Sequence, residues 1–245
     1  MSGAVAVLGA SGSIGREIAT QLTQFGRRVV LLGRSEDKLA QLSAELKQPY
    51  RVFDSDSSAS LEEVLRSLET EVGSYTGLVN CIGSVLLKAA HTTSDAEFRE
   101  IVETNLFTAF AAVRVGAQLM RNQGGSIVLF ASAAAEVGIQ NHEAIAAAKG
   151  GVIGLARSAA ATYAGRNIRV NVISPGLVRS EMTRRIWDNP ATAAASTELH
   201  ALGRLGEPSQ VAALASFLLN PAHDWITGQV IGVDGGLGHV LARRK

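Results

Sequence analysis

Short apolar segments of strand length alternate with helix-length segments along nearly the whole chain of 245 residues. The predicted strands are Ala4–Leu8, Arg28–Leu32, Tyr50–Phe53, Leu78–Ile82, Ser126–Ala131, Ile168–Ile173 and Gln229–Val233. Most of them are apolar at successive positions, as strands are when helices cover both faces of a parallel sheet. The alternation therefore predicts an α/β fold, a doubly wound parallel sheet of about seven strands with helices on both faces.

The segments between these strands have helical spacing of their apolar residues. The predicted helices are Ile18–Phe25, Leu39–Leu46, Leu61–Leu68, Ser94 to Met120 with Ser94 as N-cap, Asn141 to Ala164, and Pro208–Leu219. No shift in composition divides the chain, so a single domain over residues 1–245 is expected. The least regular segment, Leu177–Leu205, is interpreted as a substrate lid, because ligands bind beyond the carboxyl ends of the strands in this architecture.

Composition excludes several classes of function. Apolar residues make up 47% of the chain and the formal net charge is +1, which predicts a large core and no surface for nucleic acid. The single cysteine, Cys81, allows no internal disulfide and is interpreted as a small buried residue rather than a nucleophile. No signal segment or membrane span is expected, so a cytoplasmic location is predicted. No metal site is expected, since His91, His200, His223 and His239 show no metal-ligand spacing.

A glycine-rich turn separates the first predicted strand from the first helix. It reads Gly9-Ala-Ser-Gly-Ser-Ile-Gly15. Glycines at this place let the backbone approach a pyrophosphate, which then binds at the helix N-terminus. Such a turn also occurs as a plain tight turn, but its position after the first strand of an alternating chain favours a dinucleotide site.

The end of the second strand bears on which dinucleotide is bound. A fold that selects NAD places an acidic residue there to hold the ribose 2′-hydroxyl, whereas this chain reads Leu31-Leu-Gly-Arg-Ser35 and has no acid before Glu36. Arg34 could pair with a 2′-phosphate through two parallel hydrogen bonds, or be a solvated loop residue. NADP is therefore favoured, with NAD as the alternative. Arg16 either adds positive charge or is a surface residue of the helix.

Several further motifs occur in an order typical of one family. They are Gly9-x-x-x-Ser13-x-Gly15, Asn80-Cys-Ile-Gly83, Asn105 in Glu-Thr-Asn-Leu-Phe, Ser132 after the fifth strand, Lys149, Arg169-Val-Asn171, Pro175-Gly176, Gly203-Arg-Leu-Gly-Glu-Pro208, Thr227-Gly-Gln and Val-Asp234-Gly-Gly. Together they resemble the short-chain dehydrogenase/reductase superfamily over essentially the whole chain. The resemblance implies a Rossmann-type fold, an NAD(P) cofactor, hydride transfer between the nicotinamide and a small carbonyl or alcohol substrate, and a homotetramer, or a homodimer, built on the two long helices.

The resemblance also implies which residues form the site. The expected cofactor contacts are Gly9, Ser11, Gly12, Ser13, Ile14, Gly15, Arg34, Ser35, Asp54, Asn80, Gly83, Lys149, Pro175, Gly176 and Val178. Ser132 would bind the substrate oxygen, and Asn105 would position a water in the proton relay. Lys149 would hold the ribose and lower the pKa of a tyrosine four residues before it. Both residues also have a purely structural interpretation. Ser132 would then be a small residue at a strand end, and Asn105 would be a structural residue of the helix.

The position four residues before Lys149 holds Ile145, which transfers no proton. Neither Tyr50, Tyr75 nor Tyr163 stands four residues before a lysine. In one hypothesis another group supplies the proton, either Lys149 through water or His142, which shares a helix face with Ile145 and Lys149 if the helix has begun by then. In the alternative interpretation, His142 is a solvated residue in the first helical turn, after Asn141 as N-cap.

Two other hypotheses remain. In one, the substrate needs no phenolic acid, as an activated alkene would not. In the other, the protein is a catalytically silent NADP-binding sensor or partner subunit. The predicted function is an NADP-dependent oxidoreductase with a non-standard proton donor, and the catalytic candidates are Asn105, Ser132, His142 and Lys149.

Overall fold

The computed structural model describes residues 3–53 and 58–241. The strands are β1 Ala4–Leu8, β2 Val29–Gly33, β3 Tyr50–Val52, β4 Tyr75–Asn80, β5 Gly125–Phe130, β6 Ile168–Pro175 and β7 Val230–Val233. The helices are α1 Ser13–Gln24, α2 Glu36–Leu46, α3 Ser58–Ser67, α4 Glu69–Val72, α5 Asp95–Val102, α6 Thr108–Leu119, α7 Glu143–Tyr163, α8 Arg184–Trp187, α9 Pro190–Leu199 and α10 Pro208–Leu219.

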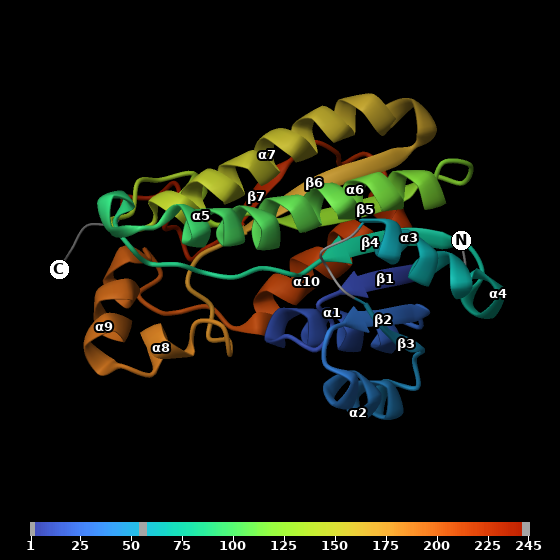
Figure 1. Ribbon diagram of the computed structural model, residues 1–245, viewed down its shortest axis with the longest axis horizontal. Coiled ribbons are helices and arrows are strands. Elements are labelled where there is room, and N and C mark those ends of the chain that lie inside the picture. Colours follow the sequence, from blue (N-terminus) through green and yellow to red (C-terminus); the bar gives the residue numbers. More distant parts are fainter. Residues whose placement is uncertain (1–2, 54–57, 242–245) are drawn as a thin grey trace.

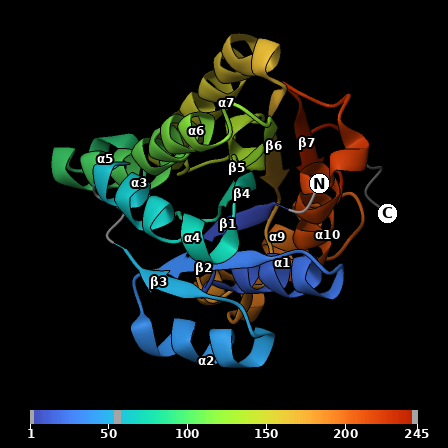
Figure 2. The ribbon, with the colours of Figure 1, turned by 90° about the vertical axis from the view of Figure 1, so that its right-hand side faces the viewer.

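All seven strands form one parallel sheet in the order β3-β2-β1-β4-β5-β6-β7. Helices α1, α2 and α10 lie on one face and α3 to α7 on the other (Figures 1 and 2). The chain moves outward in one direction from β1 to β3 and in the other from β4 to β7. The predicted doubly wound Rossmann-type architecture is confirmed, and β1 and β4 flank the switch point at which ligands bind in such sheets.

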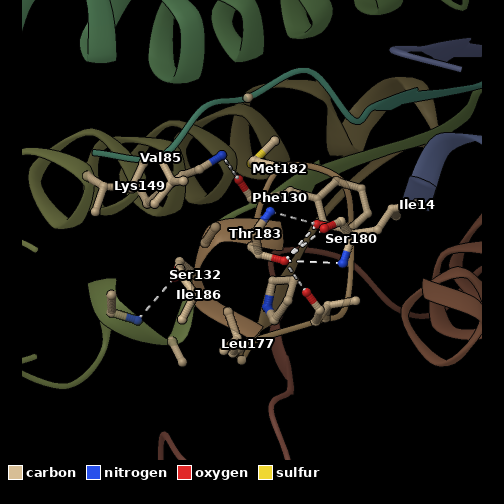
Figure 3. Close-up of a pocket in the computed structure, with 18 of the residues that line it drawn as sticks. Ile14, Val85, Phe130, Ser132, Lys149, Leu177, Ser180, Met182, Thr183 and Ile186 are labelled. Atoms are coloured by element: carbon tan, nitrogen blue, oxygen red, sulfur yellow. Dashed lines mark hydrogen bonds between the residues drawn. The ribbon is translucent and has the colours of Figure 1, made fainter. Parts of the chain in front are cut away.

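The carboxyl ends of the central strands open onto one cavity of about 310 Å³. The segments that follow β1, β4, β5 and β6 contribute to its wall, together with α7 and α8 (Figure 3). Because parallel strands all end at this edge of the sheet, residues far apart in the sequence are brought together here.

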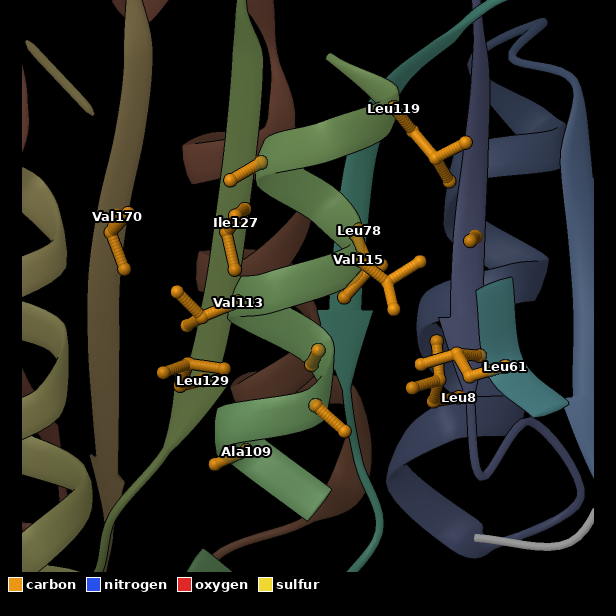
Figure 4. Packing of buried hydrophobic residues seen from close by; sticks show 14 of the residues in the cluster. Leu8, Leu61, Leu78, Ala109, Val113, Val115, Leu119, Ile127, Leu129 and Val170 are labelled. Atoms are coloured by element: carbon orange, nitrogen blue, oxygen red, sulfur yellow. The ribbon is translucent and has the colours of Figure 1, made fainter. Parts of the chain in front are cut away.

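Two hydrophobic clusters, one on each face of the sheet, hold the strands whose ends form this edge. Side chains of a strand alternate between them, as the two-residue period requires. In β1, Ala4, Ala6 and Leu8 belong to the cluster under α3, α6 and α7, while Val5 and Val7 belong to the cluster under α1, α2 and α10. Figure 4 shows part of the first cluster, in which Val113 and Val115 of α6 lie among strand residues. Most strands are therefore packed on both faces, whereas β3 at the sheet edge is partly exposed.

The structure departs from the predicted boundaries at three places. β4 begins at Tyr75 and ends at Asn80, because its ladder with β1 ends at the pair Leu8–Asn80. The helix predicted from Asn141 begins at Glu143, with His142 as N-cap and Asn141 at φ +61°. The helix predicted from Ser94 to Met120 contains a π turn, Glu103–Phe107, between α5 and α6.

The sequence suggested that the segment 177–205 is irregular, but the structure shows that part of it is helical. It contains α8 and α9, and Asn189 caps α9 by accepting from the amides of Ala191 and Thr192. Its alanine-rich sequence has no apolar periodicity, so helical spacing gave no signal.

No helix within residues 3–53 and 58–241 combines the length and apolar character that crossing a bilayer requires. Over the same residues, no three or more His, Cys, Asp or Glu side chains are grouped so that they could hold a metal ion.

Candidate active site

The turn between β1 and α1 brings its glycine backbones into close contact. Gly9 has a φ of +75°, which glycine adopts without strain. The Gly12 amide donates to the Gly9 carbonyl oxygen over 3.0 Å, and a Cβ on Gly15 would overlap that same oxygen. The first amides of α1 have no acceptor within the helix, and this end of α1 lines the cavity. The turn therefore fits a phosphate group at the helix N-terminus.

The end of β2 lies beside this turn, since a Cβ on Gly33 would be 3.3 Å from Ser11 Oγ. Arg34 is exposed and forms no hydrogen bond or ion pair with another described residue. Arg16, in contrast, is paired with Glu45 of α2. Of the two arginines considered from the sequence, Arg34 is the one whose guanidinium is available to a phosphate.

Lys149 lies on α7 with its ammonium group buried against the end of β5. Its Nζ donates to the Phe130 carbonyl oxygen over 2.9 Å, and the residue is 8% exposed. Loss of hydration lowers the pKa of Lys149 from 10.5 to about 8. An ammonium group has three donors, so Lys149 keeps donors for a bound hydroxyl group. Burial also raises the pKa of the nearby Cys81 thiol, which keeps it protonated and unreactive.

Asn105 lies in the π turn between α5 and α6 and is 1% exposed. Its Nδ2 donates to Ser84 Oγ over 3.1 Å, and its Oδ1 accepts from the Ser84 amide over 3.2 Å. A Cβ on Gly83 would lie 3.0 Å from Asn105 Oδ1 and 3.5 Å from Lys149 Nζ. Asn105 therefore holds the segment after β4 in place, and Gly83 leaves space between the amide and the ammonium group. Single π turns of this kind often mark functional sites.

Ser132 reaches the cavity from the end of β5, on the side that Lys149 also lines (Figure 3). Its Oγ accepts from the Ala134 amide over 3.3 Å. The hydroxyl hydrogen remains free to be donated, since the amide uses only a lone pair of the oxygen. Ser132 is thus able to bind a carbonyl oxygen within the cavity.

His142 and Ile145 also line the cavity, at the start of α7. The Nδ1 atom of His142 lies 2.7 Å from the Gln140 carbonyl oxygen. Because a carbonyl oxygen only accepts, Nδ1 carries a proton, and Nε2 forms no hydrogen bond with a described residue. Ile145 is 4% exposed and packs with Ile101 and Ala148. His142, Ile145 and Lys149 thus line one cavity, but the helix begins only after His142, so the condition for a shared helix face is not met.

The structure brings most of the predicted cofactor contacts to the cavity wall: Gly12, Ser13, Ile14, Gly15, Gly83, Lys149, Pro175, Gly176 and Val178. Gly9 and Ser11 lie in the glycine turn behind that wall, and Arg34 and Ser35 lie at the end of β2. Asp54 lies outside the described residues.

Asn80 does not line the cavity. It is buried, its Nδ2 donates to Thr108 Oγ1 over 3.2 Å, and its Oδ1 accepts from the Ile82 amide over 3.2 Å. Its amide is therefore used inside the protein, where it fixes the turn after β4.

His200 lines the cavity and was not found by motif reasoning. It is 4% exposed; its Nδ1 donates to the Ser196 carbonyl oxygen over 2.7 Å and its Nε2 accepts from the Leu177 amide over 3.0 Å. A Cβ on Gly176 would lie 2.6 Å from Nε2. His200 therefore ties α9 to the segment after β6. No sequence spacing could reveal this bond, because it joins residues that only the fold brings together.

Hydroxyl groups stabilise the segment that leads into α8, a second feature missed from the sequence. Thr183 Oγ1 donates to the Val178 carbonyl oxygen over 2.5 Å and accepts from the Ser180 amide over 3.1 Å. Trp187 Nε1 donates to the Ser180 carbonyl oxygen over 2.8 Å. Met182 of the same segment lines the cavity, whereas Trp187 does not.

The chain was compared with proteins of known family. A family model described as enoyl-(acyl carrier protein) reductase matches residues 9–238. The galactitol 2-dehydrogenase (L-tagatose-forming) of Cereibacter sphaeroides is 34% identical over 236 residues, which cover 94% of this chain and 93% of that protein. The chain belongs to the short-chain dehydrogenase/reductase family.

Solved structures agree with this membership. A putative gluconate dehydrogenase from Agrobacterium tumefaciens has a TM-score of 0.93 and 30% identity, covering 98% of this chain and 97% of that one. A variant of actinorhodin polyketide ketoreductase, with NADPH, has a TM-score of 0.89 and 29% identity, covering 98% of each chain. The predicted family is confirmed, and this short-chain dehydrogenase/reductase is an oxidoreductase by family.

Proposed function

We propose that this protein transfers a hydride between NADP(H) and the carbonyl or alcohol group of a small molecule. The observation that carries the proposal is that one cavity joins a phosphate-binding turn, a buried ammonium group, a free serine hydroxyl and an imidazole. A nicotinamide dinucleotide, when bound, supplies or accepts the hydride. The remaining chemistry is proton transfer and orientation of the substrate, for which the chain has its own groups.

NADP is proposed over NAD because Arg34, whose guanidinium has no partner among residues 3–53 and 58–241, stands where an acidic residue would hold a 2′-hydroxyl. Gly12 to Gly15 would bind the pyrophosphate and Lys149 the nicotinamide ribose. The NADPH present in the related ketoreductase structure supports this choice.

The proton is proposed to come from His142. Ser132 Oγ would donate a hydrogen bond to the substrate oxygen. Asn105 would keep the segment after β4 in place and position a water molecule. Ile145 stands where the family resemblance places a tyrosine and has no proton to give. His142 lines the same cavity, and its bond to Gln140 leaves Nε2 able to exchange a proton with a substrate oxygen.

The segment 177–205 is proposed as the substrate lid. The Glu181 amide donates to Ser13 Oγ over 3.2 Å, so this segment rests directly on the glycine turn. Met182 and Ile186 face the cavity from the same segment. The cytoplasmic location expected from the sequence stays a prediction.

The test is an assay of NADPH oxidation with a panel of ketones and aldehydes, run beside a titration of NADPH fluorescence. We expect binding of NADPH and turnover with at least one carbonyl compound. Binding without turnover across the panel would favour the alternative, a catalytically silent NADP-binding protein, and absence of both would reject the cofactor assignment.

Arg34→Ala is expected to raise the Kd of NADPH by about tenfold or more and to leave the Kd of NADH nearly unchanged. The reason is that a charge-assisted hydrogen bond contributes about 1.5–3 kcal/mol and about 1.4 kcal/mol changes an affinity tenfold. Calorimetric titration of both dinucleotides measures the effect. Arg121→Ala removes an exposed arginine from the loop after α6 and serves as the control. An equal loss for both dinucleotides would contradict a 2′-phosphate contact.

A homotetramer is proposed from the family resemblance. Most alanines of α6 and α7 are buried within the chain, among them Ala112 and Ala156, so they do not form the outer face. That face instead presents Phe110, 47% exposed, and Gly154, where an added Cβ meets nothing within 4 Å. Small residues let helices of two subunits approach closely.

Light scattering is expected to give four chains per particle. Gly154→Trp is expected to halve that number, because the added ring would separate the two α7 helices. Gly165→Trp, at an open position in the turn after α7, is the control. A monomer for the unmodified protein would contradict the proposal.

A further inference from the structure

The cavity lining combines two kinds of surface. At the glycine turn it includes Gly12, Gly15 and the Ser13 side chain. In Figure 3, Ile14 of that turn lies on the opposite side of the view from Ser132, Lys149 and Val85. Separate segments also contribute aliphatic side chains to the lining, namely Val85, Leu87, Ile139, Met182, Ile186 and Leu199. A substrate held in this cavity would therefore meet apolar surface.

This apolar wall is partly exposed. Val85, Leu87, Met182 and Leu199 are between 36% and 50% exposed although all four line the cavity. Exposed apolar side chains that converge from several segments mark a binding site, because covering them removes apolar surface from water. Methionine is flexible and adapts its shape to an apolar ligand.

The cavity offers an anionic substrate no cationic group that is not already assigned. Among the described residues, its ionisable lining side chains are Cys81, His142, Lys149, Glu181 and His200, of which His142 is assigned to the reacting oxygen. Lys149 is buried against Phe130 and assigned to the cofactor, and both ring nitrogens of His200 are hydrogen-bonded. The Glu181 carboxylate repels anions. A carboxylate or phosphate on the substrate would thus be desolvated without a partner, which is strongly unfavourable.

The cavity also has few groups for a polyhydroxylated substrate. Ser84 is engaged with Asn105, and the Ser180 and Thr183 hydroxyls with each other, which leaves Ser132, His142, Glu181 and Ser196 as lining side chains to bind hydroxyl groups. Of these, Ser132 and His142 are assigned to the reacting oxygen. Hydroxyl groups placed against the aliphatic wall would lose their bonds to water.

We propose that the substrate is an uncharged ketone, or the matching secondary alcohol, with an apolar body. The inference rests on the proposed function. In the reducing direction the π bond of the carbonyl breaks, the carbon gains a hydride from the reduced dinucleotide, and the oxygen takes the Nε2 proton of a protonated His142. The neutral imidazole that remains then takes up a proton from solvent. The ketone is reduced and the dinucleotide oxidised. The apolar body contacts the wall formed by Val85, Leu87, Met182 and Leu199.

The test compares 4′-methylacetophenone with 4-acetylbenzoate, which have the same skeleton and differ in charge, and with a ketohexose. We expect kcat/KM for the uncharged aryl ketone to exceed that for either other compound by at least about tenfold. Leu199→Arg adds a cation to the wall and is expected to lower this ratio at least about tenfold. Leu202→Arg is the control, because Leu202 is 67% exposed and does not line the cavity.

Binding of the same three compounds to the complex of the protein with NADP⁺ can be measured by ligand-detected NMR. This readout does not need turnover. Preferential binding of the uncharged ketone without turnover would reject the proposed function and keep the apolar site. Turnover with equal use of the charged and uncharged ketones, binding of neither, or an unchanged ratio in Leu199→Arg would overturn the apolar-substrate proposal.

Discussion

Replacement of His142 by alanine is expected to lower kcat for ketone reduction by about 10²- to 10⁴-fold, the usual contribution of a positioned acid or base. The Kd of NADPH should hardly change, because the imidazole is proposed to act on the substrate oxygen and not on the dinucleotide. The pH dependence of kcat should also change, since the proposed proton donor would be lost. Stopped-flow measurement of single-turnover NADPH oxidation at several pH values separates this effect from product release.

Two further variants make the His142 test specific. His91→Ala removes an exposed histidine that does not line the cavity and should leave kcat unchanged. Ile145→Tyr, combined with His142→Ala, should restore part of the lost rate, because it places a phenol one turn before Lys149. Unchanged turnover and pH dependence in His142→Ala would eliminate histidine as the proton donor and leave Lys149 acting through water.

Lys149→Met is expected to have two opposite effects, a more stable protein and a much weaker cofactor complex. The difference between a pKa of 10.5 and one of about 8 corresponds to roughly 3 kcal/mol at about 1.4 kcal/mol per pKa unit. Losing the bond to the Phe130 carbonyl offsets about 1 kcal/mol of this gain. We therefore expect the free energy of unfolding to rise by about 1–3 kcal/mol at pH 7, and the Kd of NADPH to rise at least about tenfold.

The same burial predicts how stability depends on pH. Between about 8 and 10.5 the unfolded chain keeps the Lys149 proton and the native protein has lost it. The free energy of unfolding contributed by this group should therefore rise with pH across that window. Urea unfolding of the unmodified protein and of Lys149→Met, without cofactor, measures the difference, and Lys38→Met on the exposed face of α2 is the control. A loss of stability in Lys149→Met at pH 7 would contradict a buried, desolvated ammonium.

Much of the fold follows from local sequence, because most strands are apolar on both faces. The alternation of Val5 and Val7 with Ala6 and Leu8 between two clusters is what a covered parallel strand requires. Helix α9 and the π turn at Asn105 did not follow from local pattern. The first has no apolar stripe, and the second contains Asn105, whose bond to Ser84 joins residues far apart in the sequence.

Some residues of the candidate site could likewise be predicted from the sequence, and others could not. Lys149, Ser132 and the glycine turn stand in motifs, so the sequence could indicate them. His200 stands in no motif, and its partner Leu177 is brought to it by the fold alone. The free Nε2 of His142 likewise depends on a single bond to Gln140 that only the loop geometry creates.

In the proposed function, a phosphorylated nicotinamide dinucleotide binds along the carboxyl edge of the sheet, from the glycine turn to Lys149. Calorimetric titration of the folded protein with NADPH and with NADH tests it most directly. We expect one NADPH to bind per chain, more tightly than NADH. Absence of heat with both dinucleotides, from protein shown to be folded by circular dichroism, would contradict the claim.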